Sequence, residues 1–144
     1  MVINDIFAFR NVISTEDDKV KLENCSTNLE NFEDVNGYKL SSNITCRIAF
    51  DIYRKIDRYK HGKVFVESID VDKYVNIFLN LYEFNNDITK RVISILEKSF
   101  RSKLIYVSTD PKNKEYHKVL EELNYIYQKD YIYPDVKLYF KEME

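Results

Sequence analysis

The sequence has 144 residues, of which 44% are hydrophobic, and a net charge of −2 at pH 7. This length suits one domain, so we expect a single domain over residues 1–144, with a core large enough to fold without a bound metal or a disulfide. The small net charge gives no bulk attraction to nucleic acid, and no apolar run approaches the roughly 20 residues that a membrane-spanning helix needs.

The N-terminus and the cysteines indicate the cellular compartment in which the protein is expected. Asn4 and Asp5 interrupt the first residues, so the chain does not begin with the apolar core of a signal peptide. Cys25 and Cys46 are too few for a disulfide framework, which favours a reducing compartment. We therefore expect a cytoplasmic protein. The abundance of Asn, Ile, Lys and Tyr is typical of an AT-rich genome, such as that of a phage, a virus or a low-GC bacterium.

The first elements expected are a strand and a long polar segment. Apolar residues alternate within residues 1–15, which predicts a strand. Residues 15–40 are polar, acidic and rich in Asn, and we expect a long excursion there with one short strand or helical turn. Residues 1–40 hold four basic and eight acidic side chains, so the acidic charge of the chain is concentrated in this part.

A helix is predicted over Ile44–Lys60, with a serine cap before it. Isoleucines recur there at helical spacing, and Gly62 would supply the left-handed stop. We expect one face to be buried (Ile48, Ile52, Ile56) and the basic residues to be exposed (Arg47, Arg54, Lys55, Arg58). The stretch Arg47–Lys63 holds six basic residues against two acidic ones, so any basic patch starts there.

The remaining elements alternate between strands and helices. In chain order they are strands at Lys63–Val71 and Tyr74–Phe84, a helix at Asp87–Ser102, a strand at Lys103–Val107, a helix at Asn113–Asn124, and a strand pair at Tyr125–Tyr133 and Asp135–Phe140. A buried strand flanked by helices implies a parallel crossover, whereas short turns imply antiparallel pairs. We therefore predict an α/β fold of the α+β type: a mixed, mostly antiparallel sheet with helices packed on it.

Histidine, cysteine and acidic residues offer other candidate sites. His61 and His117 are the only histidines, and a thiol–imidazole site such as Cys46–His61–His117 or Cys25–His117 is conceivable. Chance pairing explains these sets better, and no ligands show the close spacing of a zinc site, so no metal is expected. The carboxylates Glu67, Asp70 and Asp72 are better explained as solvated residues at a strand end than as a paired acid site.

The segment after Val107 carries the most distinctive pattern. Residues 104–125 read LIYVSTDPKNKEYHKVLEELNY, and VKLYF follows at residues 136–140. This order of strand, asparagine, tyrosine-bearing helix, helix stop and final hairpin resembles the GNAT family of N-acetyltransferases over about residues 73–143. Asn113 stands at the family's asparagine, and Leu123-Asn124-Tyr125 replaces its leucine-glycine-aromatic stop. The resemblance implies a GNAT fold and transfer of an acyl group from acetyl-CoA to an amine.

The cofactor loop implied by the resemblance departs from the family pattern. The family holds the cofactor's pyrophosphate with a glutamine- or arginine-led loop that contains small residues, and Phe84–Thr89 stands there in this chain without a glycine. Phe84 replaces the polar leader, and Asp87 places a negative charge where the phosphates bind. The resemblance assigns cofactor binding to Asn85, Asn86 and Thr89, and we expect that binding to be weak.

The resemblance also implies the catalytic residues. Leu120 aligns with the family tyrosine that protonates the leaving thiolate, and Tyr116 lies one helical turn earlier. Tyr116 and Asn113 are therefore the candidates beside the thioester. The first hypothesis is an atypical N-acyltransferase with an amine-bearing substrate.

The alternative hypothesis is a non-catalytic interaction module, of phage or viral origin, that binds a protein partner. It would use the tyrosines of the last hairpin, because exposed tyrosines are common in protein interfaces (Tyr125, Tyr127, Tyr131, Tyr133, Tyr139). The same tyrosines could stack on single-stranded nucleic acid, but the residues from Asp110 onward hold six basic and eight acidic side chains, which argues against that partner.

Overall fold

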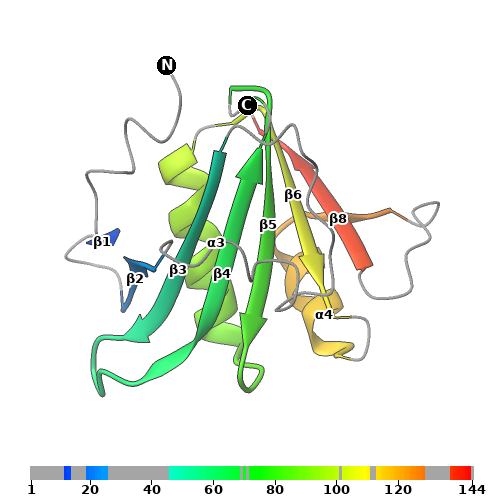
Figure 1. Ribbon diagram of the computed structural model, residues 1–144. Helices are drawn as coiled ribbons and strands as arrows, with labels where there is room; N and C mark the ends of the chain where they lie inside the picture. Colours follow the sequence, from blue (N-terminus) through cyan, green and yellow to red (C-terminus); the bar gives the residue numbers. More distant parts are fainter. Residues whose placement is uncertain are drawn as a thin grey trace.

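A computed structural model describes residues 12–13, 19–25, 46–68, 70, 72–100, 102–110, 113–128 and 137–143. These residues form one mixed sheet of eight strands in the order β1-β2-β3-β4-β5-β6-β8-β7, with two helices behind it (Figure 1). The elements are β1 (Val12–Ile13), β2 (Val20–Asn24), β3 (Cys46–Arg54), β4 (Lys60–Ser68), β5 (Tyr74–Leu81), α3 (Asn86–Phe100), β6 (Leu104–Thr109), α4 (Glu115–Glu122), β7 (Ile126–Tyr127) and β8 (Lys137–Glu142).

The predicted fold class is confirmed. Among the described strands, only β5 and β6 pair in parallel, with Tyr74 opposite Leu104 and Phe78 opposite Ser108, whereas the other neighbouring strands are antiparallel. Helix α3 is the crossover between these two strands, as the sequence predicts. Within the described residues, no helix is both long and apolar enough to span a membrane.

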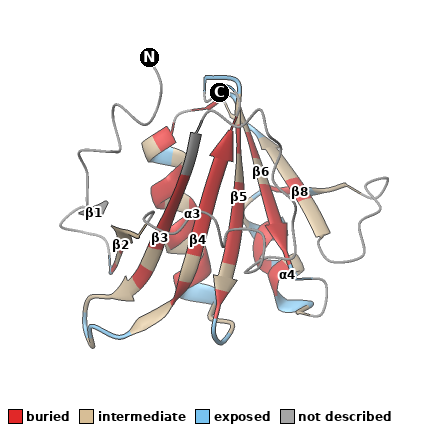
Figure 2. Cartoon of the chain, in the orientation of Figure 1, coloured by how far each residue is buried: buried red, intermediate tan, exposed pale blue. Residues whose placement is uncertain are grey.

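One face of the sheet packs against both helices. Apolar side chains alternate along the strands and point to this face, as with Ile52 on β3, Val64 on β4 and Ile77 on β5, each fully buried. The apolar stripe of α3 covers them, and all five residues predicted for that stripe are buried (Ile88, Val92, Ile95, Leu96, Phe100). Figure 2 shows the resulting buried band along β4, β5 and β6.

The last hairpin closes the sheet beyond β6. Tyr127 of β7 lies opposite Tyr139 of β8, so the two strands pair. Tyr125 is buried, and its hydroxyl donates a 2.7 Å hydrogen bond to Glu97 of α3. Lys141 of β8 lies 3.2 Å from the same carboxylate oxygen, so Glu97 ties the hairpin to the helix.

The predicted helix over Ile44–Lys60 is wrong. The chain forms β3 and then a turn that leads into β4, and Gly62 lies inside β4 rather than at a helix end. Ile48 and Ile52 are buried as expected, but Ile56 is 88% exposed at the turn. A spacing of four residues fits a strand as well as a helix, because four is a multiple of the strand period of two. Arg54 and Lys55 are half-buried and Arg58 is exposed, whereas the side chain of Arg47 lies outside the described residues.

Two other predictions have mixed outcomes. Strand β2 supplies the short strand expected within residues 15–40, and β1 covers a small part of the strand expected in residues 1–15. Most of both segments lies outside the described residues, as do Tyr131 and Tyr133 of the last hairpin.

Candidate functional site

The predicted cofactor and catalytic residues follow the carboxyl ends of β5 and β6 in the chain. The pairing of the two strands ends at Phe78 and Ser108, although β5 continues to Leu81 and β6 to Thr109. Their ribbons diverge toward this end, where α3 begins and α4 follows β6 (Figure 1). In sheets with parallel strands, ligands bind outside the carboxyl ends of the strands, where neighbouring connections leave in different directions.

The start of α3 uses the side chains of two predicted cofactor residues. Asn85 Oδ1 accepts a 2.9 Å hydrogen bond from the backbone N–H of Ile88, which makes Asn85 the cap of this helix. Thr89 is fully buried, and its hydroxyl donates a 2.7 Å hydrogen bond to the Asn85 carbonyl. Asn85 Oδ1 and the Thr89 hydroxyl therefore shape the helix start. Asn86, the third predicted residue, is exposed in the first turn.

The charge of Asp87 is not isolated. Its Oδ2 lies 2.9 Å from Nε of Arg91, one turn further along α3. Both side chains reach solvent, which weakens the pair, but the guanidinium still offsets the negative charge that the sequence places at the helix start. The repulsion of phosphates expected from Asp87 is therefore smaller than the sequence alone predicts.

Tyr116 lies where β5 leaves β6. Its side chain is 4% exposed and packs edge-on against Phe84, with the ring centroids 5.0 Å apart. Its hydroxyl makes a hydrogen bond with the backbone of Leu81 at the end of β5. Burial raises the pKa of Tyr116 to about 12, against an opposing contribution from that hydrogen bond. The phenol therefore stays protonated at neutral pH.

Asn113 stands at the start of α4 and acts locally there. Its Oδ1 accepts a 3.1 Å hydrogen bond from the backbone N–H of Glu115, and its own N–H donates to the carbonyl of Asp110. These bonds fix the turn that carries the chain from β6 into α4. The structure thus places Asn113 in the connection that positions Tyr116.

A polar cluster around His117, the residue after Tyr116, was not predicted from the sequence. His117 Nδ1 lies 2.9 Å from the hydroxyl of Tyr139, and His117 Nε2 lies 2.5 Å from Glu121. Because Nε2–H can donate to the carboxylate, Nδ1 is the acceptor for the Tyr139 hydroxyl. Thr109, at the end of β6, also hydrogen-bonds this hydroxyl, and burial raises the pKa of Tyr139 to about 12. The one available signal was the spacing of His117 and Glu121, one helical turn apart.

The thiol–histidine hypotheses find no support in the described residues. Cys25 packs against Ala49, Phe65 and Phe78, whose side chains form a small cluster apart from the core that the helices cover. His117 packs instead against the tyrosines of the last hairpin. Burial raises the pKa of the Cys25 thiol, which disfavours the nucleophilic thiolate.

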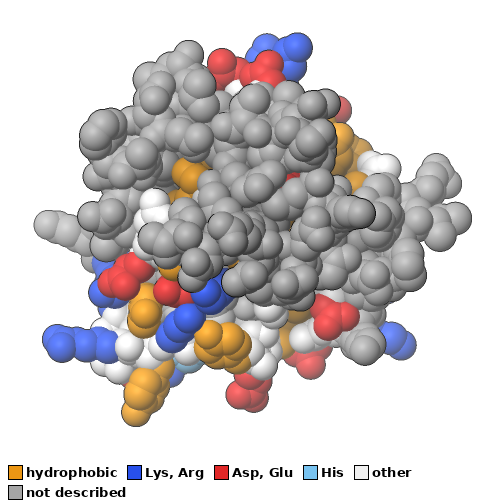
Figure 3. All heavy atoms as spheres, in the orientation of Figure 1, with side chains coloured by type: hydrophobic (Ala, Val, Ile, Leu, Met, Phe, Trp, Pro, Cys, Tyr) orange, Lys and Arg blue, Asp and Glu red, His pale blue; other side chains and the backbone are white. Residues whose placement is uncertain are grey.

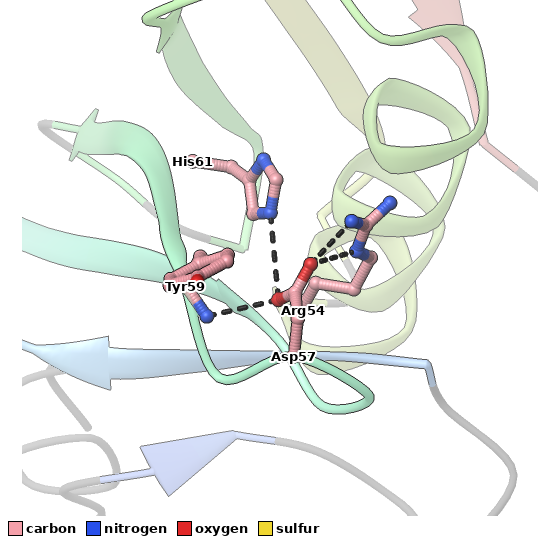
Figure 4. Close-up of polar contacts among 4 residues, drawn as sticks. All are labelled: Arg54, Asp57, Tyr59 and His61. Atoms are coloured by element: carbon pink, nitrogen blue, oxygen red, sulfur yellow. Dashed lines mark hydrogen bonds and ion pairs between the residues drawn. The ribbon is translucent and has the colours of Figure 1, made fainter.

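His61 belongs to the β3–β4 turn. As Figure 4 shows, its ring points toward Asp57, with Nε2 3.8 Å from Oδ1, and Arg54 reaches the same carboxylate from the other side. The hydrogen bonds from Arg54 and from the backbone of Tyr59 lower the pKa of Asp57. This cluster holds the turn in shape.

The three acidic residues named above as a conceivable site do not lie in one environment. Glu67 is buried in β4, whereas Asp70 and Asp72 are exposed in the turn before β5. No group of three or more histidine, cysteine or acidic side chains in the described parts of the chain is arranged to hold a metal ion.

Comparison with known proteins gives a consistent fold. No protein-family model matches the sequence, and no curated protein does. Solved structures do match: the N-terminal domain of a ribosomal-protein-alanine acetyltransferase from Clostridium acetobutylicum is 15% identical, with a TM-score of 0.57 over 91% of this chain and 95% of that one. The N-acetyltransferase PseH from Campylobacter jejuni is 14% identical, with a TM-score of 0.57 over 88% and 99% of the two chains.

A second structure of PseH holds acetyl coenzyme A. It is 13% identical to this chain, with a TM-score of 0.55 over 87% of this chain and 99% of that one. Identities this low establish the architecture and leave the activity to be argued from the site. The parallel β5–β6 pair, the α3 crossover and the closing hairpin, together with these matches over most of both chains, show that this chain has the fold of the GNAT acetyltransferases.

Proposed function

We propose that this protein is an N-acyltransferase that moves an acyl group from a coenzyme A thioester to an amine. The observation that carries the proposal is the position of Tyr116, whose hydroxyl reaches the backbone of Leu81 beyond the last pair between β5 and β6. A protonated donor is thereby held at the carboxyl end of the only parallel strand pair among the described residues.

The start of α3 fits an anionic group of the cofactor. The backbone N–H groups of Asn86 and Asp87 lie in the first helical turn, where the helix dipole favours negative charge, and Arg91 offsets the carboxylate of Asp87. These amides would hold the phosphates in place of a glycine-rich loop, with Asn85 and Thr89 supporting them through the cap. Acetyl-CoA, when bound, supplies the activated thioester.

Tyr116 would donate a hydrogen bond to the sulfur that leaves the acyl group. With its pKa raised to about 12, the phenol is protonated throughout the neutral range and is not suited to act as a base. A thiol has a pKa of roughly 8.5, so complete proton transfer from Tyr116 to the thiolate is unfavourable and stabilisation by a hydrogen bond is the expected contribution. Asn113 would contribute by fixing the turn that begins α4.

The interaction module stays the alternative, and one observation favours it. Phe84 packs against Tyr116 at the edge where the cofactor would enter, so the two rings would have to make room for it. The tyrosine-rich hairpin exposes less aromatic surface to a protein partner than its composition suggests. Tyr125 and Tyr139 are buried in the core, and Tyr127 is half-buried against His117.

Calorimetric titration of the full chain with acetyl-CoA separates the two functions, because the enzyme must bind it. In the presence of simple amines, release of the free thiol should then be measurable. Tyr116→Phe should lower kcat roughly 10- to 100-fold with little change in KM, since one hydrogen bond to developing charge is lost. Tyr106→Phe, which removes a phenol hydroxyl from β6, is the matched control and should leave kcat unchanged. An absence of acetyl-CoA binding would refute the proposal and favour the interaction module.

A further inference from the structure

A chain of hydrogen bonds runs from the end of β6 to the surface of α4. The hydroxyl of Tyr139 is bonded on one side by Thr109, the last residue of β6, and on the other side His117 Nδ1 lies 2.9 Å away. His117 Nε2 lies 2.5 Å from Oε1 of Glu121. Thr109 and Tyr139 are buried, whereas the side chains of His117 and Glu121 are 38% and 61% exposed. The chain therefore leads from a buried strand end to solvent.

The hydrogen bonds of this chain all point in one direction. Glu121 accepts from Nε2–H, so Nδ1 of the neutral imidazole accepts the one proton of the Tyr139 hydroxyl. The Tyr139 oxygen must then be the acceptor toward Thr109, and Thr109 donates. The effect on the pKa of Tyr139 agrees, because burial raises it while the Thr109 hydrogen bond acts to lower it, as a donor to the phenol oxygen does. A threonine hydroxyl that donates still has lone pairs with which to accept a hydrogen bond.

Aromatic packing holds the imidazole in this chain. The His117 ring lies edge-on to Tyr127, with the centroids 5.6 Å apart, and its centroid is also 5.6 Å from that of Tyr139. Among the described residues, the titratable groups that face the imidazole are Glu121 of α4, Tyr127 of β7 and Tyr139 of β8, and Lys137 lies 5.8 Å from the centre of the Tyr127 ring. The ring orientation that places Nδ1 at the Tyr139 hydroxyl is therefore fixed from three elements.

The buried end of the chain lies at the edge assigned to acyl transfer. The pairing of β5 with β6 ends at Ser108, so Thr109 is the first residue of β6 beyond it. Tyr116 is bonded to the backbone of Leu81 at the same end of β5, and the carboxylate of Asp110, the residue after Thr109, adds to the effect of burial in raising the pKa of Tyr116. The end of β6 and the Tyr116 phenol are thus close enough to interact.

The exposed end of the chain is acidic. Helix α4 carries three exposed glutamates (Glu115, Glu121, Glu122). Figure 3 shows red acidic side chains at the surface toward the lower right, where Figure 1 places α4. Negative charge beside the imidazole favours its protonated form, so a proton that arrives at His117 is stabilised there.

We propose that these four side chains form a proton relay, which takes the proton of the acceptor amine at Thr109 and delivers it to solvent at His117 and Glu121. The inference rests on the proposed acyl transfer and adds to it the path by which the amine loses its proton. Thr109 is the residue that would touch the amine, and the other three act through it.

The proton balance of this step is complete. The amine nitrogen bonds to the acyl carbon as the bond from that carbon to sulfur breaks, and the nitrogen then carries one proton too many. That proton passes to Thr109 Oγ while the proton of Thr109 moves to the Tyr139 oxygen and the proton of Tyr139 moves to His117 Nδ1. The imidazolium beside Glu121 then releases a proton to solvent, and the departing thiolate takes one from solvent.

The first test is nitrogen NMR of the full chain labelled with ¹⁵N-histidine, which needs no acceptor amine. His61 in the β3–β4 turn is the only other histidine and serves as the internal control. In the free protein, His117 should show a protonated Nε2 and an acceptor Nδ1. Acetyl-CoA should shift Nδ1 of His117 more than either nitrogen of His61, because hydrogen bonds in a chain polarise one another. Thr109→Val should abolish this shift, and Thr109→Ser, which keeps the hydroxyl, should retain it.

The second test is release of thiol from acetyl-CoA with simple amines. Tyr139→Phe breaks the relay and should lower kcat roughly 100-fold with little change in KM for acetyl-CoA. Tyr127→Phe keeps the packing on His117 and should change kcat by less than about 2-fold. Imidazole in solution should raise kcat of His117→Ala by at least about 10-fold, since the site of this side chain is open to solvent. Pyrazole, a ring of the same size but a far weaker base, should not rescue it, and imidazole should not rescue the double variant that also carries Tyr139→Phe.

Three results would overturn the relay while leaving the acyl-transfer proposal standing. They are acetyl-CoA binding without a shift at His117, a shift that persists in Thr109→Val, and turnover by His117→Ala at the rate of the unmodified chain. Rescue by pyrazole as strong as that by imidazole would also overturn it, because it would show that His117 only fills space. An absence of acetyl-CoA binding is a different result, which refutes the acyl-transfer proposal and the relay with it.

Discussion

Raising the pH above 10 should destabilise this protein through its buried tyrosines. Burial raises the pKa of Tyr116 and Tyr139 to about 12, and it raises that of Tyr125 too, with help from the carboxylate of Glu97. In the unfolded chain a tyrosine ionises near pH 10. Above that pH the unfolded state loses protons that the folded state retains, so the stability contributed by these residues is complete below pH 10 and lost as the pH rises.

The size of the effect follows from the number of buried phenols. Each pKa unit corresponds to about 1.4 kcal/mol, so each of the three tyrosines should cost about 1.4 kcal/mol by pH 11. Together they remove about 4 kcal/mol by pH 11 and about 7 kcal/mol by pH 12, against a typical total stability of about 5–15 kcal/mol. Lys60 acts in the same direction, because its hydrogen bond to Asp51 raises its pKa.

Urea unfolding followed by circular dichroism at pH 8, 9, 10 and 11 measures this loss. Tyr125→Phe should lower stability at pH 8 by about 1 kcal/mol, since the hydrogen bond to Glu97 is removed, and should reduce the loss between pH 9 and 11 by about a third. Tyr59→Phe, which alters a phenol in solvent, is the control. A free energy of unfolding that stays constant to pH 11, or an equal loss in Tyr125→Phe, would refute the reasoning.

Two further predictions concern β3 and β4. Ile52→Ala should destabilise the fold by about 2–5 kcal/mol in urea unfolding because its side chain is fully buried, whereas Ile56→Ala, at the exposed turn, should change stability by less than about 0.5 kcal/mol. Equal effects would contradict the assignment of this segment to a strand. Gly62→Ala should cost about 2–4 kcal/mol, because the backbone has φ of 153° and the new Cβ would lie 2.3 Å from the carbonyl oxygen of Asn80. An unchanged melting midpoint would show that β4 and β5 can move apart.

The second half of the fold was predictable because several local signals agree there. Around α3 an asparagine cap, a long apolar stripe and a short apolar strand point to one arrangement, and the crossover follows from general rules of strand connection. Around β3 the signals conflict. Ile48 and Ile52 fit both periods, and Gly62 can stop a helix or allow two strands to approach closely. Asn80, which Gly62 approaches closely, lies 18 residues away in sequence, so no local signal distinguishes these two roles of Gly62.

The candidate site likewise has a part that was predictable from the sequence and a part that was not. The position of Tyr116 on the inner face of α4 follows from the helical pattern, and the structure confirms its burial. The roles of Asn85 and Thr89 could not be derived in advance, because whether a polar side chain bonds its own helix start or faces a ligand depends on side-chain orientation. The contact between His117 and Tyr139 joins residues 22 positions apart, and it requires β8 to lie beside β6.

The order of strands in the sheet also sets how fast its parts can assemble. The turn from Arg54 to Lys60 closes a loop of five residues, whereas β6 and β8 pair across the 27 residues between Thr109 and Lys137. Each doubling of loop length adds about 0.6 kcal/mol of closure entropy, so the second loop costs about 1.5 kcal/mol more to close. The lower closure cost therefore favours early pairing of β3 with β4 over pairing of β6 with β8, so the edge of the sheet beside α4 depends on the more costly contact.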